Sequence, residues 1–199
     1  MSRLAIFIDG GYYSALAEKH YHIRIDFSKF VERIKTEVAS KTPDSLDLLR
    51  TFYYDCPPYQ SSAPTTTEST RYAEKMSFFN YLETLPRVQI RKGILAYRGR
   101  NQRREPIFQQ KRIDLMLGLD LAEQSTKHLI THLALVAGDS DFCPAIEFAK
   151  RESVLAFLFH GPRISPANSS CTFAQDLFAC ADERCEIDQT FIDIVKRTP

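Results

Sequence analysis

The sequence has no long hydrophobic run, no paired cysteine motif and little net charge. No segment approaches the roughly 18 apolar residues of a membrane span, and the apolar run near the amino terminus is too short for a signal peptide. The chain has 5 cysteines and no CxxC pair, and an odd number at irregular spacing is typical of reduced thiols. We therefore expect a cytoplasmic protein without a membrane partner.

Several catalytic signatures are also missing. Neither GxGxxG nor GxxxxGK[ST] occurs, which excludes the common nucleotide-binding loops, and there is no GxSxG elbow of a serine hydrolase. His128 and His132 have the spacing of a zinc pair on a helix, but no HExxH motif or cysteine partner accompanies them. We expect these histidines to be structural or exposed.

The size of the chain fits one domain. At 199 residues with 44% hydrophobic content, it is long enough for one well-buried core and short for two. We therefore expect a single domain over residues 1–199. The sequence leaves the oligomeric state open, and a homo-oligomer is compatible with it.

The net charge of +1 hides an uneven distribution. Residues 87–112 contain nine lysines and arginines and one acid, Glu105, so this segment carries +8 and the rest of the chain −7. Such a segment can neutralise the phosphates of a nucleic acid, although an exposed face without function is the common alternative. The residues that we expect to contact RNA are Arg98, Arg100, Arg103, Arg104, Lys111 and Arg112.

Apolar runs and helical spacings alternate along the chain. Short, uninterrupted apolar runs are typical of strands buried on both faces of a parallel sheet, and they cover residues 4–8, 46–54, 133–137 and 154–159. Apolar residues recur at helical spacing over residues 27–38, 71–85, 113–124 and 173–181. This order predicts an α/β fold with a mostly parallel central sheet and helices on both faces.

The other segments give weaker predictions. Residues 88–97 alternate in part like a further strand, and the arginine-rich residues after them are expected to form a loop. The polar residues 60–69 predict a surface loop, and residues 185–194 predict a last strand or short helix.

Residues 133–146 hold the feature around which the rest of the chain is organised. An apolar run is followed by Asp139, Ser140 and Asp141 before Pro144 opens a helical pattern. Ser140 or Asp141 is the expected cap of that helix, and capping is the common alternative to a catalytic role for Asp141. Ligands of open α/β sheets bind at the carboxyl ends of the strands, where these two aspartates are expected to lie.

Other acids follow the same pattern. Asp9 comes directly after the first apolar run, and Asp114 lies in the first turn of a predicted helix, where the helix dipole stabilises a carboxylate. Asp120 lies roughly 120° around that helix from Asp114, so we rank it second. Asp55 ends another apolar run and could reach the same edge, but it precedes two prolines, which favours a role in a turn.

We therefore expect Asp9, Asp114, Asp139 and Asp141 to converge at one edge of the sheet. Carboxylates this close repel one another unless a cation neutralises them. Mg²⁺ and Mn²⁺ prefer oxygen ligands, and at such a site they promote hydrolysis of phosphodiester bonds. The basic segment could bind a polyanionic substrate of such a site.

Four motifs in order resemble a known family: AIFIDGGYY, FYYDCPP, QKRIDLMLGLDLA and LVAGDSDFCPAIEFAK. They resemble the NYN domains of the LabA-like group, relatives of PIN-domain nucleases, from about residue 4 to residue 182. The resemblance implies a PIN-like, Rossmann-type three-layer fold and a metal-dependent endoribonuclease that acts on RNA, most readily single-stranded RNA. It also implies that Asp9, Asp114, Asp139 and Asp141 bind Mg²⁺ or Mn²⁺.

One departure from the family pattern keeps a second hypothesis open. Many members carry Asn three residues after the first Asp, and here that position is Tyr12. If the Asn helps to hold the metal or the substrate, this chain is a catalytically weak RNA-binding or regulatory protein of the same fold. A third hypothesis, an aspartyl-phosphate phosphatase, needs an acid two residues after Asp9, and Gly11 occupies that place.

Overall fold

A six-stranded sheet forms the centre of the computed structural model, which describes residues 1–100, 106–163 and 169–197. Its strands are β1 (Ser2–Asp9), β2 (Leu46–Asp55), β3 (Val88–Lys92), β6 (His132–Val136), β7 (Leu155–His160) and β8 (Glu183–Glu186). They lie in the order β3-β2-β1-β6-β7-β8, and every neighbouring pair is parallel. The predicted parallel sheet is confirmed.

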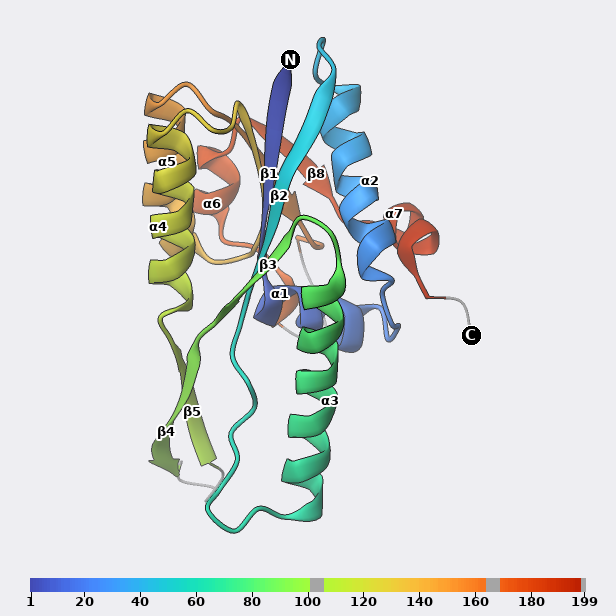
Figure 1. Cartoon of the computed structure of the whole chain (residues 1–199), viewed down its shortest axis with the longest axis vertical. Coiled ribbons are helices and arrows are strands. Elements are labelled where there is room, and N and C mark those ends of the chain that lie inside the picture. Colours follow the sequence, from blue (N-terminus) through green and yellow to red (C-terminus); the bar gives the residue numbers. More distant parts are fainter. Residues whose placement is uncertain (101–105, 164–168, 198–199) are drawn as a thin grey trace.

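Two layers of helices cover this sheet (Figure 1). The helices are α1 (Gly10–Ser14), α2 (Phe27–Ser40), α3 (Thr66–Thr84), α4 (Ile113–Thr126), α5 (Cys143–Arg151), α6 (Gln175–Cys180) and α7 (Gln189–Val195). Alternate residues of β1 pack against different layers. Leu4, Ile6 and Ile8 lie in the core beneath α2, α3 and α7, whereas Ala5 and Phe7 lie beneath α4, α5 and α6. Burial on both faces explains why the strands read as uninterrupted apolar runs.

The strand order reverses at β1. The chain runs outward from β1 to β2 and β3, and then returns to the other side of β1 as β6, β7 and β8. The carboxyl ends of β1 and β6 therefore flank a topological switch point, which is where open parallel sheets bind their ligands.

Residues 94–100 and 106–111 form two paired strands, called the hairpin below, where the arginine-rich residues were expected to form a loop. The single strand predicted over residues 88–97 is divided at Gly93 into β3 and β4 (Ile94–Arg100), and β4 pairs antiparallel with β5 (Pro106–Lys111). A Cβ at Gly93 would lie 2.7 Å from the carbonyl oxygen of Lys111 and 2.8 Å from Sγ of Cys56, so only glycine fits this crossing. The hairpin extends beyond the sheet, as does the lower part of α3 (Figure 1).

Helix α3 begins earlier than the polar sequence around it predicts. The Thr65 hydroxyl accepts a hydrogen bond from the backbone N–H of Glu68, and the Glu68 carboxylate accepts one from the backbone N–H of Thr65. This capping box starts the helix at Thr66, inside the segment expected to be a loop.

Candidate functional site at the acidic edge of the sheet

Asp9 and Asp139 lie on the two sides of the switch point. Asp9 is the last residue of β1, and Asp139 follows β6 by three residues. Side chains alternate along a strand, so Asp9 shares the side of Ala5 and Phe7, which is the side covered by α4. Asp114 lies in the first turn of α4. The carboxylates of Asp9 and Asp114 therefore lie on the same side of the sheet.

Asp9 is held by the turn that follows it. Its Oδ1 accepts hydrogen bonds from the backbone N–H groups of Gly11, at 2.8 Å, and Tyr12, at 3.3 Å, and so caps α1. Burial, with a smaller contribution from the charges of Asp55 and Asp114, raises the pKa of Asp9 to about 6 despite the lowering effect of these hydrogen bonds. The carboxylate is thus fixed in place and is costly to ionise without a cation.

Asp114 responds to the acids of the central turn. Partial burial raises its pKa above the usual value, and the charges of Asp139 and Asp141 contribute to the rise. Charge effects on pKa thus link Asp9 to Asp114, and Asp114 to Asp139 and Asp141.

The central turn is a short 3₁₀ helix, Ser140–Phe142, that leads into α5. Asp139 caps it, because its Oδ1 accepts a hydrogen bond of 3.1 Å from the backbone N–H of Asp141. Helix α5 itself begins after Phe142 with no side-chain cap, so the expectation that Ser140 or Asp141 caps it was wrong. The Asp139 and Asp141 side chains are exposed and Ser140 is half-buried, so the turn presents two carboxylates to solvent.

The acids do not form a finished metal site. Within the described ranges, no three His, Cys, Asp or Glu side chains are placed so that they could hold a metal ion. The four acids also have no ion pair with any described Lys, Arg or His, although ten other ion pairs are formed. The carboxylates that the fold brings to this edge are therefore left without a positive partner from the described part of the chain.

Asp55 is a fifth acid at this edge, a position that the sequence allowed while favouring a role in a turn. It is 4% exposed, its Oδ2 lies 2.5 Å from Nζ of Lys75, and the hydroxyl of Tyr53 donates to it at 3.1 Å. A Cβ on Gly10 would lie 2.6 Å from the same carboxylate, which is why glycine follows Asp9. The usable sequence signal was a third apolar run ending in an aspartate.

Asp120 is engaged elsewhere. Its two carboxylate oxygens accept hydrogen bonds from Nε and Nη2 of Arg91, at 2.8 and 3.0 Å, and the hydroxyl of Tyr54 donates to it at 2.9 Å. Asp120 is 8% exposed. A buried carboxylate with these partners joins α4 to the sheet, which places this second-ranked residue in the scaffold.

Tyr12 also serves the scaffold. It is 6% exposed, and its hydroxyl accepts a hydrogen bond of 2.7 Å from the backbone N–H of Gly161 and donates one of 3.3 Å to the carbonyl of Cys171. A Cβ on Gly138 would lie 2.5 Å from its ring. Tyr12 therefore ties α1 to the segments that follow β6 and β7, and its hydroxyl is committed to backbone partners.

The hairpin adds aromatic side chains that the sequence analysis did not single out. Tyr97 and Phe108 face each other across β4 and β5, and both contact Tyr59, with ring centroids 5.9 and 5.1 Å from it. Arg98 donates to the side-chain oxygen of Gln109 at 3.0 Å.

The basic residues predicted to contact RNA are only partly visible. Arg98, Lys111 and Arg112 are exposed, and Arg100 belongs to β4. Arg103 and Arg104 lie outside the described residues.

The two histidines with zinc-like spacing lie on different elements. His132 is in β6, buried, and close to the hydroxyls of Thr131 and Thr42, whereas His128 is exposed after α4. They do not share a helix face, in keeping with the expectation of structural or exposed histidines.

An all-parallel α/β sheet with acids at its switch point defines a domain with a PIN-like fold. The model of the NYN domain family matches residues 3–178, so this chain belongs to the NYN domain family, whose members are typically nucleases. The match does not distinguish subgroups, and the likeness to the LabA-like group stays a prediction. No curated protein sequence matches the chain significantly. Among the described helices, none has the length and apolar character needed to cross a bilayer.

Proposed function

We propose that this protein is a metal-dependent endoribonuclease that hydrolyses phosphodiester bonds of single-stranded RNA at Asp9, Asp114, Asp139 and Asp141. The observation that carries the proposal is the placement of Asp9 and Asp139 after the adjacent strands β1 and β6, with Asp114 in the first turn of α4. Burial, and then repulsion between the acids, raises the pKa values of Asp9 and Asp114. An acidic group of this kind is stabilised by binding a cation.

The donor chemistry suits Mg²⁺ or Mn²⁺. These ions take carboxylate oxygens and keep water positions open for a substrate. When bound, such an ion polarises a phosphoryl oxygen and lowers the pKa of an attacking water. Asp9 is fixed by the α1 turn, whereas Asp139 and Asp141 are exposed. The exposed acids are the ones whose side chains are free to turn towards an ion.

The hairpin supports RNA as the substrate. Tyr97 and Phe108, which are 46% and 38% exposed, lie on one face of the hairpin, and the exposed Arg98 and Lys111 lie on its other face. Basic side chains that follow a backbone, combined with aromatic faces on which bases stack, are the general means of holding a single strand. The hairpin is expected to hold RNA leading to the acidic edge.

A second candidate function is RNA binding with little turnover. The commitment of Tyr12 to backbone partners favours it, because that side chain cannot take part in holding a metal or substrate. Under this hypothesis the four acids bind a metal weakly, and the protein binds RNA in a salt-dependent way without cutting it.

A cleavage assay on end-labelled single-stranded RNA in Mn²⁺ or Mg²⁺ distinguishes the nuclease from the RNA-binding protein. The proteins to compare are the wild type, Asp139→Asn and Asp44→Asn, the last a matched change of an exposed aspartate between α2 and β2. Cutting that needs metal, is lost in Asp139→Asn and is kept in Asp44→Asn supports the nuclease. Equal cutting by all three proteins would identify a contaminant, and salt-dependent binding without cutting would favour the second function.

A further inference from the structure

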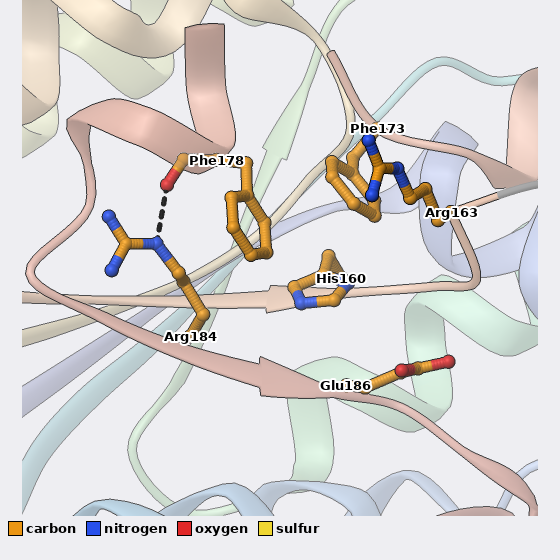
Figure 2. A pocket seen from close by; sticks show the side chains of 6 residues that line it. All are labelled: His160, Arg163, Phe173, Phe178, Arg184 and Glu186. Atoms are coloured by element: carbon orange, nitrogen blue, oxygen red, sulfur yellow. Dashed lines mark hydrogen bonds between the residues drawn. The ribbon is translucent and has the colours of Figure 1, made fainter. Parts of the chain in front are cut away.

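A pocket of about 330 Å³ opens at the carboxyl ends of β7 and β8, next to the acidic edge (Figure 2). It is lined by His160, Arg163, Phe173, Phe178, Arg184 and Glu186. This volume lies at the lower end of the range of small-ligand sites. None of these residues has a part in the site described above.

The pocket is joined to the acidic turn by the backbone. The N–H of Ala174, the neighbour of Phe173, donates a hydrogen bond of 2.8 Å to the carbonyl of Gly138, the residue before Asp139. His160 ends β7, which pairs directly with β6. Neighbouring strands are about 4.8 Å apart, so the pocket lies within one or two strand spacings of the β6 end.

Aromatic rings form its wall. Phe173 and Phe178 are stacked, with centroids 5.0 Å apart and an angle of 21° between their planes, and His160 contacts both rings. The Arg184 guanidinium carbon lies 5.0 Å from the centroid of Phe178, so Phe178 is placed between Phe173 and Arg184 (Figure 2). Phe173 is therefore the ring of the stacked pair that Arg184 does not cover.

The polar groups at the rim include two acceptors. His160 Nδ1 lies 2.7 Å from the carbonyl of Gly161, which can only accept, so Nδ1 carries the proton. Burial lowers the pKa of His160, which keeps the ring neutral and leaves Nε2 as an acceptor. Glu186 adds an exposed carboxylate, and it pairs with His160 across β7 and β8.

Two positive groups flank these acceptors. Arg184 is partly engaged, because its Nε donates to the carbonyl of Phe178 at 2.6 Å and its Nη2 to that of Ala179 at 3.2 Å. Arg163 is exposed at the opposite side of the pocket (Figure 2). Guanidinium groups here suit the phosphates on either side of a bound nucleoside.

We propose that this pocket binds one guanine base of the RNA, stacked on Phe173 and read by Glu186. Guanine is the base that offers two adjacent donors, N1–H and the N2 amino group, to a single carboxylate. Uracil, adenine and cytosine each offer a donor at only one of these places. An effect of this guanine on where the RNA is cut rests on the function proposed above. Binding of the guanine does not require cleavage.

The test measures binding without cleavage, by isothermal titration in EDTA with the Asp139→Asn protein. An octauridine and the same RNA with one central guanosine are compared. We expect the guanosine to increase affinity about ten-fold and Glu186→Gln to remove the gain, because a charged hydrogen bond is lost. Phe173→Leu should weaken binding of the guanosine RNA roughly five-fold through lost stacking.

Matched variants exclude general effects. Glu74→Gln changes an exposed acid on α3, and Phe148→Leu changes a half-buried ring on α5, and both should keep the preference for guanosine. Equal affinity for the two RNAs, or a preference that survives Glu186→Gln, would overturn the proposal. A guanosine preference in a protein that never cuts RNA would support the pocket and refute only the nuclease.

Discussion

Replacing Asp9 by Asn should stabilise the protein. Asn keeps an oxygen that can accept from the amides of Gly11 and Tyr12, so the cap of α1 is retained. What is removed is the cost of ionising a carboxyl whose pKa is raised to about 6 from the ordinary 3.8 by burial and by neighbouring acids.

The magnitude follows from that difference. One unit of pKa corresponds to about 1.36 kcal/mol, so the folded wild type carries a penalty of up to about 3 kcal/mol at pH 8. Since part of this cost is relieved by relaxation of a half-buried group, we expect Asp9→Asn to gain about 1–3 kcal/mol. For a domain of this size, each kcal/mol raises the melting temperature by roughly 2–4 °C.

The pH dependence has a definite sign. Above about pH 6, Asp9 is ionised in both the folded and the unfolded state, and the penalty is complete. As the pH falls from about 6 towards 3.8, the folded protein retains its proton and the penalty disappears. The advantage of Asp9→Asn should therefore be largest at pH 8, smaller at pH 5 and absent below pH 4.

Urea unfolding at pH 8, 6 and 5 in EDTA measures these differences, with Asp44→Asn as the exposed control. Mg²⁺ should then stabilise the wild type more than Asp9→Asn, because the ion replaces the missing neutralisation. An Asp9→Asn protein that is no more stable than the wild type at pH 8, or whose gain is independent of pH, would refute the reasoning.

Three further predictions follow from the scaffold and the hairpin. Asp120→Asn should cost about 2 kcal/mol or more in urea unfolding, because Arg91 loses its charged partner, while RNA cleavage by the folded protein is unchanged; loss of cleavage at full folding would give Asp120 a catalytic role. Gly138→Ala should cost about 1–3 kcal/mol and slow cleavage, because its Cβ would lie 2.4 Å from the carbonyl oxygen of Thr172; unchanged stability and rate would contradict this. The double change Lys111→Gln and Arg112→Gln should weaken RNA binding and reduce its salt slope by about 1.4, measured by fluorescence polarisation; an unchanged slope would remove the hairpin from the RNA path.

Strands that are buried on both faces were readable from the sequence because their burial requires uninterrupted apolar runs. The position of Asp9 and Asp139 after two such runs then followed from the general geometry of parallel sheets. The first-turn position of Asp114 was equally local, since helical spacing fixes where α4 begins.

Features that depend on contacts between distant residues were not readable. The hairpin depends on Tyr97 pairing with Phe108 and on the tight crossing at Gly93, neither of which appears in local periodicity. Asp55 was read as a turn residue because two prolines follow it, and its ion pair with Lys75, which lies in a later helix, gives no local signal. The capping box of α3 was the exception, because Thr65 and Glu68 have the spacing of that motif and could have been found.

The most direct test of the acidic edge is binding of Mn²⁺ to the purified protein at pH 7.5, followed by the loss of the free-ion signal in electron paramagnetic resonance. Wild type and Asp44→Asn should bind the ion equally, and Asp139→Asn should bind it at least ten-fold more weakly. Equal binding by all three proteins, or no binding by the wild type at millimolar Mn²⁺, would contradict the assignment of these carboxylates to a metal-dependent site.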